Sequence, residues 1–188
     1  MQDGVRESAA AQLYQLCLMV APEKGRAALT KPLLKLLDDA SPAVLGKLLP
    51  HLTVCLSRLE FDAQSAKELC DATLRAEARI GRRWRLSRAL LAALPALAEV
   101  VAADAVNDAL LPLVFSQLAG GAAAARDAAA AALVQLFRML TKERHRTEVR
   151  VAAPPRRSPR LIAWCTATLR PAIDGHFARR AGARACAA

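Results

Sequence analysis

DGVRESAAAQL, at residues 3–13, sets apolar side chains four residues apart at Val5, Ala9 and Leu13. This spacing keeps the three side chains on one face of an α-helix. The same triplet returns at Val44, Leu48 and Leu52, at Leu86, Leu90 and Leu94, and at Ala125, Ala129 and Leu133. A period of about forty residues is typical of stacked helix pairs. We therefore expect an all-α, right-handed α-solenoid of about three and a half helix pairs.

The composition agrees with a helical protein. Aromatic residues make up only 4% of the 188 residues, whereas Ala and Leu are very common. Such side chains favour helices over strands. The alternation of β-branched residues that is typical of strands is almost absent.

The charge divides the chain into two parts. Residues 1–141 hold 16 Lys and Arg against 14 Asp and Glu, a net charge of +2, whereas residues 142–188 hold 11 against 3, a net charge of +8. The second part also contains the Pro- and Arg-rich stretch Ala153–Arg160. We predict a solenoid over 1–141 and a basic, mostly disordered tail over 142–188. A basic tail can bind any polyanion, so it does not make the helical part a nucleic-acid binder.

Capping residues and prolines predict where the helices begin and end. Pro32 and Pro112 both fall inside helical periodicity, 80 residues or two periods apart, which suggests a recurrent bend. The first expected helix runs from about Gly4 to Val20 with Asp3 as its N-cap, the second from Pro22 to near Asp38, and the third from Pro42, with Ser41 as its N-cap, to Leu56. The fourth follows Asp62 as far as Leu74, the fifth runs from Trp84 to about Val101, the sixth is capped by Asp104 and ends at Gly120, and the last runs from Ala123 to Leu140.

The cysteines and the apolar stretches favour a cytoplasmic protein. The cysteine count is odd and no C-x-x-C pair occurs, which suits a reducing compartment. Residues 1–7 do not form a secretory signal. The uncharged stretches Ser8–Pro22 and Ala109–Ala125 are short for membrane spans, so we expect buried helices and no membrane partner.

The residue types that carry chemistry are scattered. His51, His145 and His176 have no Cys, Asp or His partner at the spacing of metal ligands, and no phosphate-binding loop or nucleophile motif occurs. We expect no catalytic residue, no metal, no cofactor and no small-molecule substrate.

The repeated helices resemble those of HEAT-repeat proteins, in which the second helix of a pair opens with Asp-x-Val-Arg followed by Ala and Leu. Asp3-Gly4-Val5-Arg6 matches this opening closely, and Arg126 with Ala129 and Leu133 matches it in part. Pro32 and Pro112 match the proline of the first helix. Leu45 and Ser87 stand where the motif has Arg. The resemblance covers residues 3–140.

The segment WRLSRALLAALPALA, residues 84–98, is similar to the scaffold and regulatory subunits of type 2A-like serine/threonine phosphatases, including those of phosphatase 4. This resemblance rests mainly on residues 82–140. It implies a non-catalytic scaffold that binds a phosphatase catalytic subunit through the turns between paired helices.

The predicted partner-binding residues lie at three such turns. The first turn holds Asp38, Asp39 and Ser41, the second holds Arg82, Arg83, Trp84 and Arg85, and the third holds Gly120 and Gly121. Trp and Arg are frequent in binding hot spots. The structural alternative is that Trp84 packs over a neighbouring helix while the arginines pair with acidic residues of adjacent repeats. Asp38 and Asp39 stand at the equivalent turn one repeat earlier, and we expect them to complement Arg82 or Arg85 across the stack.

Two other functions fit the same sequence. One is a HEAT- or armadillo-type adaptor of transport or nucleic-acid machinery, in which the basic tail takes part. The other is a fragment of a larger HEAT scaffold, because the first helix lacks a preceding partner. In that case Leu13, Leu16 and Met19 should leave apolar surface exposed, and the isolated chain should self-associate or be marginally stable.

Overall fold

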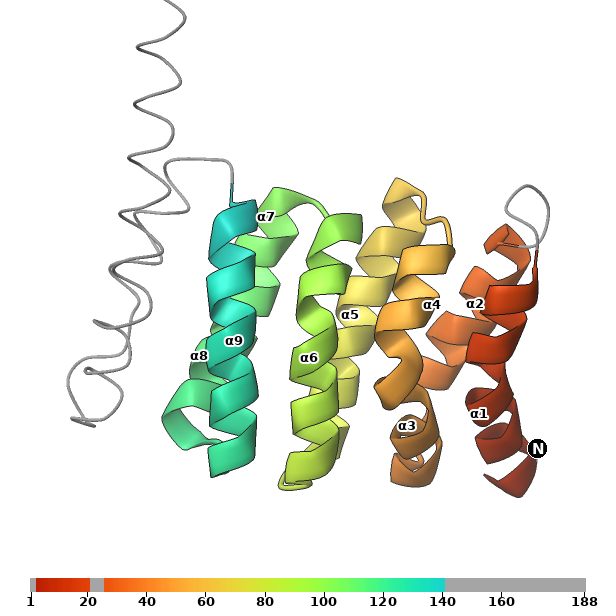
Figure 1. Ribbon diagram of the computed structural model, residues 1–188, viewed down its shortest axis with the longest axis horizontal. Helices are drawn as coiled ribbons and strands as arrows, with labels where there is room; N and C mark the ends of the chain where they lie inside the picture. Colours follow the sequence, from red (N-terminus) through yellow and green to blue (C-terminus); the bar gives the residue numbers. More distant parts are fainter. Residues whose placement is uncertain (1–2, 21–25, 141–188) are drawn as a thin grey trace, which may run out of the picture.

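The structure, a computed structural model, describes residues 3–20 and 26–140 (Figure 1). The described residues form helices joined by short turns, without any strand, which confirms the all-α prediction. The helices are α1 (Asp3–Met19), α2 (Arg26–Leu37), α3 (Pro42–Leu48), η1 (Leu49–His51), α4 (Leu52–Arg58), α5 (Ala63–Ile80), α6 (Trp84–Val100), α7 (Ala103–Ala105), η2 (Val106–Leu110), α8 (Leu111–Gly120) and α9 (Ala123–Met139). Of these, η1 is a 3₁₀ turn and η2 is a π-helical segment. The predicted tail, 142–188, lies outside the described residues.

The helices are arranged in two layers (Figure 1). One layer contains α1, the α3–η1–α4 unit, α6 and α9, and each packs against the next. The other layer contains α2, α5 and the α7–η2–α8 unit. The four apolar triplets of the sequence all fall in the first layer, but Val5 and Ala9 of the first triplet are exposed, whereas Leu13 is buried. No helix in the described ranges is long and apolar enough to cross a membrane.

Local sequence accounts for most helix boundaries. Asp62 caps α5, since its Oδ1 accepts a hydrogen bond of 2.7 Å from the Ser65 N–H. Pro42 opens α3, where its missing N–H costs nothing, and Ser41 stands at the N-cap position without a side-chain cap. The expectation that Asp104 caps its helix is wrong, because Ala102 is the residue before α7.

The four prolines within the helical pattern are accommodated in three ways. Pro32 and Pro95 lie inside α2 and α6, which continue through them. Pro50 lies in η1, the 3₁₀ turn that divides α3 from α4. Pro112 is the second residue of α8, which begins where the π-helical η2 ends. A proline removes one backbone donor and crowds the carbonyl four residues earlier, so a local change of helical pitch next to it is a physical consequence.

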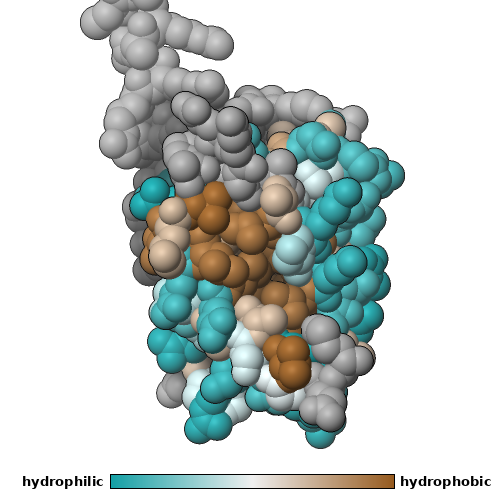
Figure 2. Space-filling view, turned by 90° about the vertical axis from the view of Figure 1, so that its right-hand side faces the viewer, coloured by the Kyte–Doolittle hydropathy of each residue, from teal (hydrophilic) through white to brown (hydrophobic). Residues whose placement is uncertain are grey.

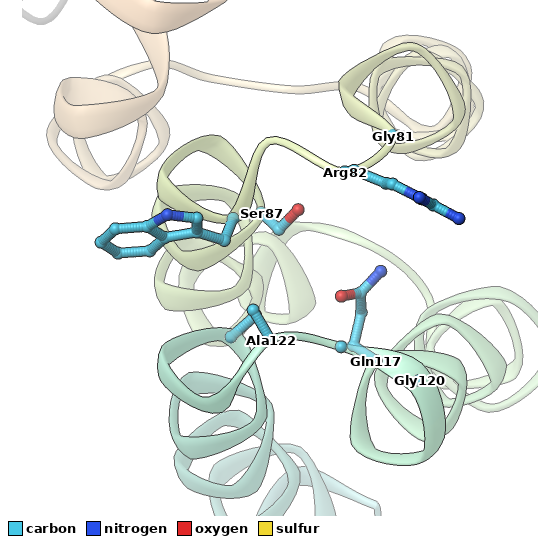
Figure 3. Close-up of a pocket in the computed structure, with 9 residues that line it drawn as sticks. Gly81, Arg82, Ser87, Gln117, Gly120 and Ala122 are labelled. Atoms are coloured by element: carbon cyan, nitrogen blue, oxygen red, sulfur yellow. The ribbon is translucent and has the colours of Figure 1, made fainter.

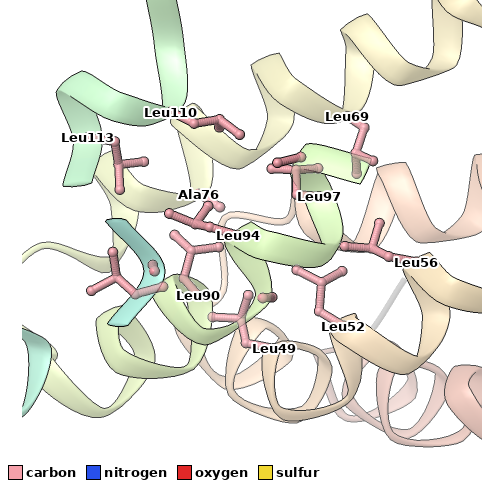
Figure 4. Packing of buried hydrophobic residues seen from close by; sticks show 14 of the residues in the cluster. Leu49, Leu52, Leu56, Leu69, Ala76, Leu90, Leu94, Leu97, Leu110 and Leu113 are labelled. Atoms are coloured by element: carbon pink, nitrogen blue, oxygen red, sulfur yellow. The ribbon is translucent and has the colours of Figure 1, made fainter. Parts of the chain in front are cut away.

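The core lies between the two layers (Figure 4). Leu90, Leu94 and Leu97 of α6 are buried at its centre. Around them lie buried side chains of both layers, namely Leu49, Leu52, Leu56, Leu69, Ala76, Leu110 and Leu113. Leucines and alanines dominate this cluster, so the helices approach one another through aliphatic contacts. The core holds the turns between α5 and α6 and between α8 and α9 close together.

Candidate partner-binding surface

The turn between α5 and α6 is made by Gly81, Arg82 and Arg83. Gly81 has a φ of 55°, in the left-handed region that favours glycine, and this conformation ends α5. The chain then enters α6 at Trp84. The tight reversal leaves Arg82, Arg83 and Arg85 exposed, together with Arg88 one turn into the helix.

These four arginines take part in no ion pair within the described part of the chain. Arg83 donates from Nη1 to the carbonyls of Arg79 and Ile80 at 3.5 Å, across the end of α5. Trp84 remains 39% exposed, and the Arg85 guanidinium lies 4.8 Å from the centroid of its ring. The ring face attracts the guanidinium, so the two side chains lie together at the surface. The alternative in which the arginines pair with acidic residues of adjacent repeats is therefore not what the described residues show.

A hollow of about 410 Å³ joins this turn to the turn between α8 and α9. Its lining comprises Gly81, Arg82, Trp84, Ser87, Gln117, Gly120, Gly121, Ala122 and Ala125. Figure 3 shows the side chains of Arg82 and Gln117 on one side of the hollow, with Ser87 between the two turns. The structure thus brings together the second and third of the predicted turns, which are about forty residues apart in sequence. We call the exposed arginines, Trp84 and this hollow the turn surface.

Gly121 lines the hollow, and the position requires a glycine for a steric reason. Its N–H donates to the Gln117 carbonyl at 2.8 Å, which closes the last turn of α8. A Cβ at this position would stand 2.4 Å from that same oxygen. Gly120 has no such constraint, since a Cβ there would meet nothing within 4 Å. The two glycines, which look alike in the sequence, therefore differ in their structural role.

Asp38 and Asp39 lie at the turn between α2 and α3, and their partners differ from those expected. Asp38 Oδ1 accepts from Arg75 Nε at 2.9 Å and from Arg79 Nη1 at 2.8 Å, both on α5. Asp39 Oδ2 accepts from Arg6 Nε on α1 at 2.7 Å. The expectation that Arg82 or Arg85 pairs with them is corrected: Asp38 and Asp39 instead bind arginines of α5 and α1.

The hydrogen bonds at Asp38 have an electrostatic consequence. Those from Arg75 and Arg79 hold the pKa of the Asp38 carboxyl below its usual value. Asp39 Oδ1 also accepts from the Ser41 N–H at 2.8 Å, so this carboxylate orders the entry to α3. Asp38, Asp39 and Ser41 thus fasten neighbouring helices to one another, and they do not line the hollow.

Four residues of this region were not singled out from the sequence: Arg75, Glu77, Arg79 and Gln117. Gln117 Nε2 donates to Glu77 Oε1 at 2.9 Å, across 40 residues, and Arg75 and Arg79 reach Asp38 across 37 and 41 residues. These separations are close to the sequence period. A search for complementary polar side chains one period apart would therefore have found them.

Two further clusters lie elsewhere in the molecule. Cys17 and Cys55 are buried and their thiols interact between α1 and α4. Burial raises the pKa of Cys55 to about 12, with a further contribution from Cys17. His51 stacks on Tyr14, with ring centroids 3.9 Å apart, as a packing contact between η1 and α1. Among the residues in 3–20 and 26–140, no group of three or more His, Cys, Asp and Glu could hold a metal ion.

Comparison of the chain with protein-family models, with curated proteins and with solved structures found no match. The likeness to HEAT-repeat proteins and to phosphatase scaffolds therefore rests on the residues quoted above.

Proposed function

We propose that the two-layer array is a right-handed α-solenoid of HEAT-type helix pairs, and that the protein is a non-catalytic scaffold. In this proposal the turn surface binds an acidic segment of a protein partner. The observation that carries it is the set of exposed arginines without acidic partners among the described residues, beside a partly exposed Trp84 and a hollow. Uncompensated charge at a surface steers a partner of opposite charge.

The chemistry of the hollow suits an acidic side chain. Arg82 supplies a guanidinium that can bind a carboxylate through two parallel hydrogen bonds (Figure 3). The Gln117 amide on the same side already donates to Glu77, so Arg82 is the group available to a partner. α6 and α9 both begin at this surface, and neither has a side-chain cap at its N-terminus. The positive ends of the two helix dipoles therefore add to the attraction for an anion. Trp84 offers apolar contact at the edge.

The resemblance of residues 82–140 to phosphatase scaffolds suggests which partner to test first. The proposed partner is a catalytic subunit of a type 2A-class serine/threonine phosphatase, bound in the cytoplasm. In this proposal the turns between paired helices form a ridge that docks the subunit, and the flexible stack of helices holds it near its substrates. That the partner is a phosphatase and that the partner is acidic are two separate claims, because the turn surface can bind another acidic protein through the same contacts.

A second candidate is an adaptor of transport or nucleic-acid machinery. The net charge of +8 in residues 142–188 favours this candidate, because lysine and arginine side chains bind the phosphates of nucleic acids. Deletion of 142–188 separates the candidates: polyanion binding should fall steeply, whereas binding of an acidic protein at the turn surface should persist.

The test is co-purification of the full chain with phosphatase catalytic subunits, quantified by mass spectrometry. The variant Arg82→Glu with Arg85→Glu should lose the partner at least about tenfold, because two attractive charges become repulsive. The matched control is Lys47→Glu with Lys67→Glu, which makes the same change in net charge at exposed positions of α3 and α5. Both variants should keep the wild-type helicity.

Three outcomes are informative. Loss of binding in the arginine variant alone supports the turn surface. Equal loss in both variants would show that only the net charge matters and would contradict it. Capture of an acidic protein other than a phosphatase, with the same dependence on Arg82 and Arg85, would keep the surface and reject the phosphatase assignment.

A further inference from the structure

Helix α1 is apolar on two faces, which is unusual for a helix at the edge of an array. Its inner face buries Ala10, Leu13 and Cys17 against α3 and α4. Its outer face leaves large apolar side chains in solvent: Val5 is 52% exposed, Leu16 is 46% exposed and Met19 is 81% exposed. Of the residues expected to be exposed here, Leu16 and Met19 are exposed, whereas Leu13 is buried.

The exposed residues follow a regular pattern. Val5, Ala9, Gln12, Leu16 and Met19 are spaced by four, three, four and three residues, and all five are exposed. This is the spacing of the core positions in a coiled coil, where such a row packs against a second helix. We call these five residues the outer seam. Figure 2 shows the apolar area at this end of the molecule.

The outer seam and its flanks carry no charge. Gly4, Ser8 and Gln15 border it, and the charged residues of α1 after its first residue are Arg6 and Glu7, both half-buried. Arg6 is held by Asp3 at 2.8 Å and by Asp39 at 2.7 Å, on the side away from the seam. An uncharged apolar row does not select a basic or an acidic partner. It fits another uncharged helix face.

The outer seams of two copies are complementary to each other when the two α1 helices run antiparallel. In an antiparallel pair centred on Gln12, the small Ala9 faces the large Leu16 of the second copy, and Val5 faces Met19 of the second copy. Gln12 then faces Gln12 of the second copy, and two carboxamides can exchange hydrogen bonds. A single polar residue within an apolar seam fixes the register of paired helices.

We propose that the outer seam is a dimer interface, on which a second copy of this chain packs its own α1 antiparallel about a two-fold axis through Gln12. A helix of 17 residues is about 25 Å long, so an interface confined to one helix of each copy is at the small end of specific interfaces. A reversible dimer in the micromolar range, about 1–100 μM, is therefore expected. The seam lies at the opposite end of the array from α9, so both turn surfaces stay accessible (Figure 1).

The first test is sedimentation equilibrium of the full chain across that concentration range. Leu16→Glu should weaken association at least about tenfold, because it places a charge in the apolar contact with Ala9 of the second copy. Leu18→Glu is the matched control: it lies on the same helix and is 52% exposed, but it is not part of the seam. The control should dimerise as the wild type does, and circular dichroism should show unchanged helicity in both variants.

A second test addresses the antiparallel register. Val5→Glu and Met19→Lys should each weaken the homodimer, whereas an equimolar mixture should form heterodimers, since Glu at 5 then faces Lys at 19. In a parallel pair these two positions are far apart, so mixing would restore nothing.

The proposal is overturned by a wild-type chain that stays monomeric throughout the range. A dimer that survives Leu16→Glu, or that Leu18→Glu also abolishes, places association elsewhere in the chain and overturns it as well. The proposal does not depend on the turn surface or its partner, because the two surfaces share no residue.

Discussion

Arg6 and Asp39 form an ion pair of 2.7 Å that joins the first turn of α1 to the turn between α2 and α3. The same carboxylate accepts the Ser41 N–H with its other oxygen at 2.8 Å. One side chain therefore connects three helices, with both oxygens engaged.

Replacement of Asp39 separates these two contacts. Asp39→Ala removes both and should lower the free energy of unfolding by about 1–3 kcal/mol, because a backbone N–H loses its acceptor and Arg6 loses a charged partner. Asp39→Asn keeps an oxygen for Ser41 and should cost about half as much. Urea denaturation followed by circular dichroism measures both; equal losses would show that the Ser41 contact contributes nothing.

The Asp38 carboxyl should give a small dependence of stability on pH. Its pKa is lowered from 3.8, first by the hydrogen bond from Arg75 and then by that from Arg79. A group whose pKa is lowered by folding stabilises the native state above the pKa of the unfolded chain, and this contribution is lost as the pH falls through the lowered value. The advantage of wild type over Asp38→Asn should therefore be constant above about pH 4 and shrink below it. The carboxylate is partly exposed, so the difference is modest.

Gly120 and Gly121 should respond in opposite directions to alanine. Gly121→Ala should destabilise the protein by about 1–3 kcal/mol, because the added methyl group overlaps the Gln117 carbonyl and forces the turn to move. Gly120→Ala should be neutral or stabilise by up to about 1 kcal/mol, since it ends α8 in open space and restricts the unfolded chain. Thermal melting of the two variants distinguishes them, and a Gly121→Ala variant as stable as wild type would contradict the geometry.

The buried thiols should react slowly in the native protein. Burial raises the pKa of Cys17, Cys55 and Cys70, that of Cys55 to about 12, so little thiolate exists at pH 8. In a background of Cys165→Ser with Cys186→Ser, a thiol reagent should modify these three only at the rate of unfolding. Rapid labelling at pH 8 without denaturant would show that α1, α4 or α5 opens locally.

The spacing of apolar residues predicted the helices of the first layer because side chains that recur every three or four residues lie on one face of a helix, and that face is buried. It could not predict which face of α1 turns inward, since both faces are apolar. The prediction for Leu13 was wrong for that reason, while the predictions for Leu16 and Met19 were confirmed.

The turn surface was predictable only in pieces. Arg82, Trp84, Gly120 and Gly121 stand out as turn residues, but their meeting around one hollow depends on how α6 packs against α9. The partners of Asp38 were mistaken because the long side chains of Arg79, in the last turn of α5, and of Arg75, one turn earlier, both reach it. The sequence period predicts which helices are neighbours, but it does not predict which residue a long, flexible side chain reaches on the neighbouring helix.

The two-layer arrangement also determines the order in which the helices should unfold when the molecule is pulled or heated. Among the described helices, α6 packs against α4, α5 and α9, whereas α1 packs mainly against α2, α3 and α4. Pulling or heating should therefore unzip the array from its ends toward α6, and hydrogen exchange should show a gradient of protection that peaks there. A partner bound at one end of the array would stabilise the helices at that end, so more helices would unfold together and a larger force would be needed to unfold them.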